Sequence, residues 1–143
     1  MSLAILTFVH IIISLVALAA GFLFYQGLRD GQPRAEKLFL ATTTLTSLTG
    51  YLFPVQKLLP SHIVGALSLL LLAIAWKTRP SGGRAYIITS LSAFYLNLLV
   101  FTAQLFKRIP EVKSMEPIAQ LLLLLVFVSA TVSLVRGLAR RPS

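Results

Sequence analysis

The chain has 143 residues, of which 57% are hydrophobic and only 12% are charged, and its mean hydropathy is +0.86. Globular domains carry about 25% charged residues, so we expect this apolar surface to face lipid and the lipid bilayer to be the main partner. The absence of cysteine excludes thiolate catalysis, disulfide relays and iron–sulfur clusters. The net charge of +9 comes from basic residues at the ends of apolar segments, where anionic lipid headgroups account for them, so nucleic acid is not a predicted partner.

Five apolar stretches contain no Asp, Glu, Lys or Arg. Because a membrane-spanning helix needs about 20 apolar residues, they predict an all-α integral membrane bundle of about five helices, forming one domain over residues 1–143. The second stretch, of about 16 residues, covers only about 24 Å at 1.5 Å per residue, so the second and third together could instead form a shallower hairpin. The five stretches are residues 3–28, 38–53, 58–76, 85–106 and 117–135.

The first stretch resembles a signal peptide at Ala17-Leu18-Ala19, but no basic residue precedes Arg29, so we interpret it as a retained helix. His10, Ser14, Ala17 and Gly21 follow each other at helical spacing. This face carries small and polar residues together, and we expect it to pack inward.

The second stretch is rich in threonine and serine, whose hydroxyls can bond the backbone carbonyl one turn earlier; this favours close helix contact over function. The fourth stretch places Ser90, Ala93, Asn97 and Gln104 on one face, and the fifth carries Gln120. The amides cannot satisfy themselves locally, so they need partners within the bundle.

Basic residues predict the orientation. Nine of them follow the first, third and fifth stretches and four lie at the other ends, so the positive-inside rule favours an external N-terminus and a cytoplasmic C-terminus. The nine are Arg29, Arg34, Lys37, Lys77, Arg79, Arg84, Arg136, Arg140 and Arg141, and the four are Lys57, Lys107, Arg108 and Lys113.

Counting residues from the cytoplasmic ends places both histidines about 21–23 Å above the inner aromatic belt, at 1.5 Å per residue. The same rule puts polar groups of the other helices in the outer half of the membrane, while the inner half is nearly all aliphatic. We therefore predict one connected polar site, with Tyr51 and Tyr95 as further candidates. Its candidate binding residues are His10, Thr49, His62, Asn97, Gln104 and Gln120.

Several chemistries fit this set. His10 and His62 could be the axial ligands of a haem b, or could hold copper with Met115, whereas a quinone could accept hydrogen bonds from His10, Asn97 or Gln104. In the structural alternative, His62 lies among lipid headgroups and His10 bonds a neighbouring amide. No carboxylate lies within a stretch and no catalytic motif is present, so an enzyme is not indicated.

Three parts of the chain resemble a group of small uncharacterised bacterial inner-membrane proteins: the run from Thr43 to Pro54, Pro60-x-His62-x-x-Gly65, and Tyr95-Leu-Asn97 followed by Gln104-x-Phe106-x-x-Ile-Pro110. The resemblance implies a multi-pass protein of the bacterial inner membrane. It implies no activity, cofactor or site residue.

Three function classes therefore remain open. The first is a membrane protein that binds a haem or a quinone in the polar layer. The second is a structural or accessory subunit of a homo-oligomer or larger membrane complex, whose polar layer only joins helices. The third is a transporter of a neutral hydrophobic molecule, which the lack of a visible repeat disfavours.

Overall fold

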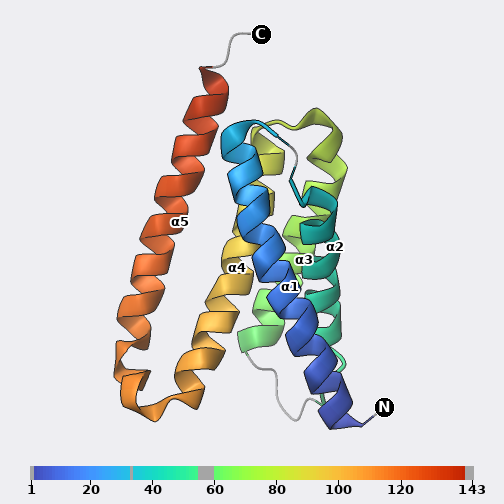
Figure 1. The fold of residues 1–143 in the computed structure, drawn as a ribbon, viewed down its shortest axis with the longest axis vertical. Helices are drawn as coiled ribbons and strands as arrows, with labels where there is room; N and C mark the ends of the chain where they lie inside the picture. Colours follow the sequence, from blue (N-terminus) through green and yellow to red (C-terminus); the bar gives the residue numbers. More distant parts are fainter. Residues whose placement is uncertain (1, 33, 55–59, 141–143) are drawn as a thin grey trace.

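A computed structural model describes residues 2–32, 34–54 and 60–140, and every regular element in this part of the chain is helical. Five α-helices follow one another, and short 3₁₀ turns precede the last two (Figure 1). They are α1 (Leu3–Asp30), α2 (Glu36–Gly50), α3 (Pro60–Thr78), η1 (Arg79–Ser81), α4 (Arg84–Arg108), η2 (Pro110–Met115) and α5 (Glu116–Ala139).

Four of the helical segments are long and apolar enough to cross a membrane, which confirms the predicted all-α fold and its spanning-length helices. They are Leu3–Asp30, Pro60–Ser81, Arg84–Arg108 and Pro110–Ala139. The helix α2, of 15 residues, is not among them. It stops at Gly50 instead of residue 53, because the Tyr51 N–H bonds the Leu48 carbonyl and the Leu52 N–H bonds the Thr49 carbonyl, each at 3.1 Å and three residues back. The predicted start of the third stretch, at Leu58, and Lys57 before it, lie outside the described residues.

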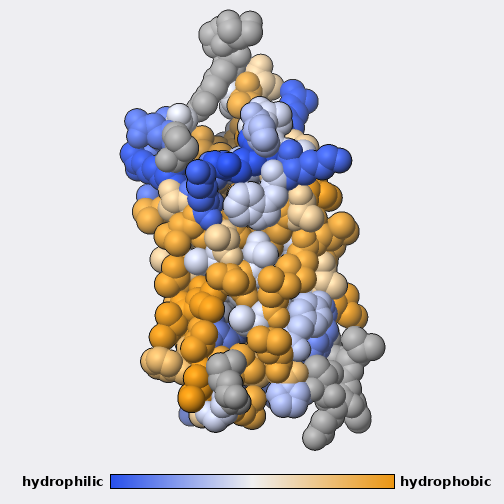
Figure 2. Space-filling model, turned by 90° about the vertical axis from the view of Figure 1, so that its right-hand side faces the viewer, coloured by the Kyte–Doolittle hydropathy of each residue, from blue (hydrophilic) through white to orange (hydrophobic). Residues whose placement is uncertain are grey.

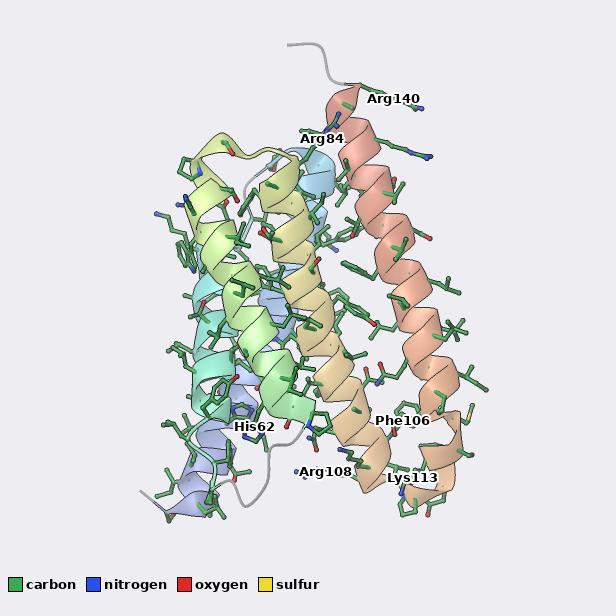
Figure 3. All side chains as sticks on the ribbon, turned by 180° about the vertical axis from the view of Figure 1, so that it is seen from behind. His62, Arg84, Phe106, Arg108, Lys113 and Arg140 are labelled. Carbon is green, nitrogen blue, oxygen red and sulfur yellow. The ribbon has the colours of Figure 1, made fainter. Side chains whose placement is uncertain are left out.

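Consecutive helices run antiparallel, so the molecule has two distinct ends (Figure 1). We call the end that holds Ser2, His62 and Arg108 the N-terminal end, and the one that holds Asp30, Arg84 and Arg140 the C-terminal end (Figure 3). Helices α1 to α4 form a bundle, and α5 packs on the outside of it, mainly against α4.

The turn from α1 to α2 depends on two glycines. Gly31 ends α1 in the left-handed conformation, at φ 71°, and the Gln32 N–H bonds the Gly27 carbonyl at 2.8 Å. A Cβ on Gly27 would lie 2.4 Å from the Gln32 carbonyl oxygen, so only glycine allows the chain to fold back here. This tight return places α2 directly alongside α1.

The packed core occupies the C-terminal half of the bundle. Phe24 stacks on Phe39 with ring centroids 4.9 Å apart, and Phe94 meets Phe39 edge-on at 5.8 Å. Ala17 is fully buried and Gly21 is buried with it, which confirms the predicted inward face of the first helix. Because these large rings fill the C-terminal half, any internal space must lie towards the other end.

The hydropathy of the surface also changes along the long axis of the bundle. Hydrophilic residues gather around the C-terminal end, and a broad apolar surface extends below them, interrupted by small pale patches (Figure 2). Apolar side chains of α1 and α5, such as Phe8 and Val126, are about two-thirds exposed, at 65% and 66%. Such exposure suits a bundle whose outer faces contact lipid hydrocarbon.

Candidate functional site

A cavity of about 520 Å³ lies in the N-terminal half of the bundle. All four helices of the bundle line it, α1 with residues 7–15, α2 with 46–50, α3 with 61–68 and α4 with 96–108, joined by residues that follow α2. It faces hydrophobic side chains over most of its wall, but a string of polar groups is set among them. These are Thr7, His10, Ser14, Thr46, Ser47, Tyr51, Ser61, His62, Ser68, Asn97, Gln104 and Arg108.

His10 projects from α1 towards α2. Its Nδ1 lies 2.8 Å from the Thr49 hydroxyl, and its ring meets Phe53 edge-on at 5.3 Å. Gly50 leaves space for the imidazole, since a Cβ there would contact the His10 Cε1 at 3.9 Å. The ring is thus held in one orientation by the Thr49 hydroxyl. The structural alternative expected a neighbouring amide as its partner instead.

His62 lies in the first turn of α3, at the N-terminal end of the molecule (Figure 3). The Tyr51 hydroxyl donates to the His62 carbonyl oxygen at 2.6 Å, and the two rings pack at 5.7 Å between centroids. A Cβ on Gly65 would lie 3.3 Å from the Tyr51 oxygen, so glycine makes room for this tyrosine. Both histidines therefore reach the same cavity, from different helices.

Two buried polar atoms of the lining residues have no hydrogen-bond partner among the described residues. They are the Asn97 Nδ2 on α4 and the Thr46 Oγ1 on α2. A buried group left unpaired costs about 1–3 kcal/mol. Nearby, Ser47 and Ser68 bond each other at 3.3 Å across α2 and α3. The wall therefore combines satisfied hydroxyls with two groups that a bound molecule could satisfy.

The remaining predicted site residues divide into two groups. Gln104 lines the cavity, and Thr49 acts on it through His10. Gln120, by contrast, lies between α4 and α5, where its Nε2 donates to the Leu99 carbonyl oxygen at 3.3 Å. Tyr95 also turns to α5 and stacks on Phe127 at 4.7 Å. The structure thus does not bring Gln120 or Tyr95 to the cavity.

Metal binding finds little support in the donor set. Within residues 2–32, 34–54 and 60–140, no group of three or more His, Cys, Asp or Glu side chains could hold an ion. Met115, considered above as a copper ligand, is 54% exposed and is not part of the cavity wall. Copper binding by His10 and His62 with Met115 is therefore not supported by the geometry.

Some cavity residues were not candidates in the sequence. Thr46, Ser47 and Ser68 looked like ordinary helix-contact residues, and Arg108 like a membrane-boundary charge. The sequence did carry a signal for them, because each lies near a glycine at helical spacing. Thr46 and Ser47 precede Gly50 by four and three positions, and Ser68 follows Gly65 by three. Small and hydroxyl residues concentrated on two consecutive helices at one depth mark an internal face.

A second polar cluster lies at the C-terminal end and was not anticipated. The Glu36 carboxylate accepts hydrogen bonds from the Tyr86 hydroxyl and, at 3.0 Å, from the Arg79 guanidinium. These groups come from α2, η1 and α4. Partial burial of Glu36 raises its pKa, but the bonds from Tyr86 and Arg79 and the charges of Arg79 and Lys37 outweigh this, so its pKa lies below the ordinary value.

Comparisons with protein-family models, with curated proteins and with solved structures find no match for this chain.

Proposed function

We propose that the protein is a multi-pass membrane protein that binds a neutral, lipophilic molecule of the quinone class in the cavity between α1 and α4. The observation that carries the proposal is the pair of buried, unpartnered groups in the cavity wall, Asn97 Nδ2 and Thr46 Oγ1. Ligand sites are typically apolar cavities of 300–1,000 Å³ with a few polar groups that orient the ligand. A cavity of about 520 Å³ with this wall has that character.

The chemistry of the wall favours an uncharged ligand. Among the described residues that line the cavity there is no carboxylate. One guanidinium is present, that of Arg108, the last residue of α4, at the N-terminal end of the molecule (Figure 3). An oxygen acceptor would receive hydrogen bonds from Asn97 and Thr46, and the apolar body would contact residues such as Ile11 and Val100. Quinone rings with their carbonyl oxygens combine these two properties.

The placement in the membrane belongs to the same proposal. We place α1 to α5 across a bacterial inner membrane, with the N-terminal end outside and the C-terminal end in the cytoplasm. The distribution of basic residues supports this orientation, and it puts the cavity in the outer half of the bilayer.

Haem b is the second candidate, because His10 and His62 line one cavity from two helices. The bond between His10 Nδ1 and Thr49 resembles the outer contacts that orient ligating histidines. A visible spectrum of the purified protein tests it: a haem b gives a strong band in the blue region that shifts on reduction. A colourless protein with an extractable quinone supports the first candidate instead.

The sharper test uses Asn97→Leu, with Gln120→Leu as the matched control in the neighbouring helix α5. Leucine at 97 removes a donor that has no partner in the bundle, so stability should be unchanged or higher while affinity for tetramethylbenzoquinone falls about tenfold, the equivalent of about 1.4 kcal/mol. Leucine at 120 removes the bond to Leu99 and the unpartnered Gln120 Oε1, and it lies outside the cavity wall, so affinity should not change. Calorimetric titration in nanodiscs and thermal unfolding measure both.

The opposite pattern would contradict the proposal. If Asn97→Leu destabilises the fold and the wild-type protein binds neither quinone nor haem, the polar layer only joins helices, and the accessory-subunit function takes its place.

A further inference from the structure

The contacts of the Thr49 hydroxyl favour one position for the proton on the His10 ring. The hydroxyl oxygen lies 2.8 Å from the Leu45 carbonyl and 3.2 Å from the Thr46 carbonyl, both on its own helix. A carbonyl can only accept, and a hydroxyl has a single hydrogen. If that hydrogen pointed to His10 instead, the hydroxyl and the Leu45 carbonyl oxygen would face each other at 2.8 Å with no hydrogen between them. Donation to the α2 backbone avoids this repulsion, and it leaves the hydroxyl oxygen as an acceptor.

This arrangement makes His10 Nδ1 the donor in the 2.8 Å contact with Thr49. In an uncharged imidazole with a proton on Nδ1, Nε2 carries a lone pair and can only accept. Among the described residues, no donor bonds Nε2, and the ring belongs to the cavity wall. His10 thus offers the cavity an acceptor, whereas Asn97 Nδ2 offers it a donor.

The two groups need different hydrogen-bond partners: His10 Nε2 needs a donor, and Asn97 Nδ2 needs an acceptor. A quinone has only carbonyl oxygens and could satisfy Asn97 but not His10. A hydroquinone has hydroxyl groups, which donate to an acceptor and also accept from a donor, so it could satisfy both. We propose that the cavity selects the reduced, hydroquinone form of its ligand, with a ring hydroxyl donating to His10 Nε2 and a ring oxygen accepting from Asn97. This inference rests on the proposed function and specifies the redox form that the site prefers.

The affinity should therefore depend on whether the ligand carries a hydrogen-bond donor. Three probes share one ring: tetramethylhydroquinone, its dimethyl ether and tetramethylbenzoquinone. We expect the hydroquinone to bind the wild-type protein about tenfold more tightly than either other probe, since one hydrogen bond contributes about 1 kcal/mol or somewhat more. Calorimetric titration in nanodiscs under argon measures all three.

The role of Thr49 is tested by Thr49→Val, with Thr44→Val as the control. Thr44 makes the same kind of backbone bond, to Leu40 at 2.7 Å, but does not contact His10. Valine at 49 frees the imidazole to place its proton on Nε2, so the preference for the hydroquinone should shrink to within twofold. Valine at 44 should leave the preference intact.

Nitrogen-15 NMR of the labelled His10 reads the tautomer directly, because a protonated and an unprotonated ring nitrogen differ widely in chemical shift. We expect Nδ1 protonated and Nε2 unprotonated in the wild type; a proton on Nε2 would overturn the inference. This measurement and the three-probe comparison also decide the case if Thr49→Val fails to fold.

The outcomes separate the two proposals. Equal binding of all three probes rejects the selection of the hydroquinone but leaves the cavity as a site for lipophilic rings. Binding of none rejects the proposed function, and the inference with it.

Discussion

Gly21 shows how closely the helices approach in the C-terminal half. A Cβ at this position would lie 2.4 Å from the Phe94 ring, and Ala17, one turn earlier on the same face, is fully buried. In a membrane, where lipid is as apolar as the protein, helices associate through such close packing of small residues. At the residue scale, the absence of side-chain atoms is therefore what brings α1 and α4 together.

We expect Ala17→Phe to lower the free energy of unfolding by about 1–3 kcal/mol, because the added ring has no space in a packed interior. Ala66→Phe, on the exposed face of α3, should change it by less than about 0.5 kcal/mol. Thermal unfolding in detergent compares the two. Equal effects would mean that size alone, and not burial, determines the outcome.

At the scale of elements, α2 is the exception in this bundle. It has 15 residues, yet it supplies Thr46, Thr49 and Gly50 to the surroundings of the cavity. Its other end is fixed by Glu36, which receives hydrogen bonds from η1 and α4. A short helix held at one end by polar bonds and packed along its length against α1, with Phe39 and Leu40 in the core, is thereby positioned accurately.

The Glu36 cluster should therefore contribute measurably to stability. Glu36→Ala leaves the partly buried Arg79 and Tyr86 groups without their acceptor, and we expect a loss of about 1–3 kcal/mol. Glu111→Ala is the matched control, since Glu111 is exposed and forms no ion pair within the described residues. Chemical or thermal unfolding of both variants provides the measurement. If the two variants lose the same free energy of unfolding, the cluster does not stabilise the position of α2.

The same cluster predicts a dependence on pH. Glu36 precedes the apolar part of α2, and its pKa in the folded protein lies below the ordinary value of 4.5. Its contribution is thus complete above pH 4.5 and is lost as the pH falls through the lower, folded-state pKa. Unfolding temperatures measured from pH 7 down to pH 3 should fall more steeply at the acid end in the wild type than in Glu36→Ala. Parallel curves would contradict this.

At the scale of the whole molecule, the antiparallel order of the helices sets the arrangement of its two ends. Figure 3 shows Arg84 and Arg140 at one end and Arg108 with Lys113 at the other. If α1 to α5 all cross the membrane, these ends lie on opposite sides, with the end that carries Arg140 in the cytoplasm.

Reporter fusions test this arrangement directly. A fusion at Ser143 should report the cytoplasm, and one in the turn from Pro110 to Ser114 the external side. The same sidedness at both positions would reject the five-span topology, since α5 would then not cross. A fusion in the turn between α1 and α2, after Asp30, should agree with the one at Ser143.

The sequence by itself indicated the all-helical class of this protein and the approximate course of its helices. Long charge-free stretches favour helices that can span a membrane, because unpaired backbone groups are too costly in hydrocarbon, and four helical segments are long and apolar enough to do so. Local spacing also identified the inward face of Ala17 and Gly21, since helical periodicity alone relates residues one turn apart.

Tertiary structure decided which polar residues meet. Depth counting placed His10, His62, Asn97 and Gln104 in the outer half of the membrane, and all four line the cavity. It gave Gln120 a similar depth, yet that side chain lies between α4 and α5, because depth fixes the position along a helix axis but not the direction in which the residue faces. The contact between His10 and Thr49 joins residues 39 positions apart, and only the packing of α1 against α2 could reveal it.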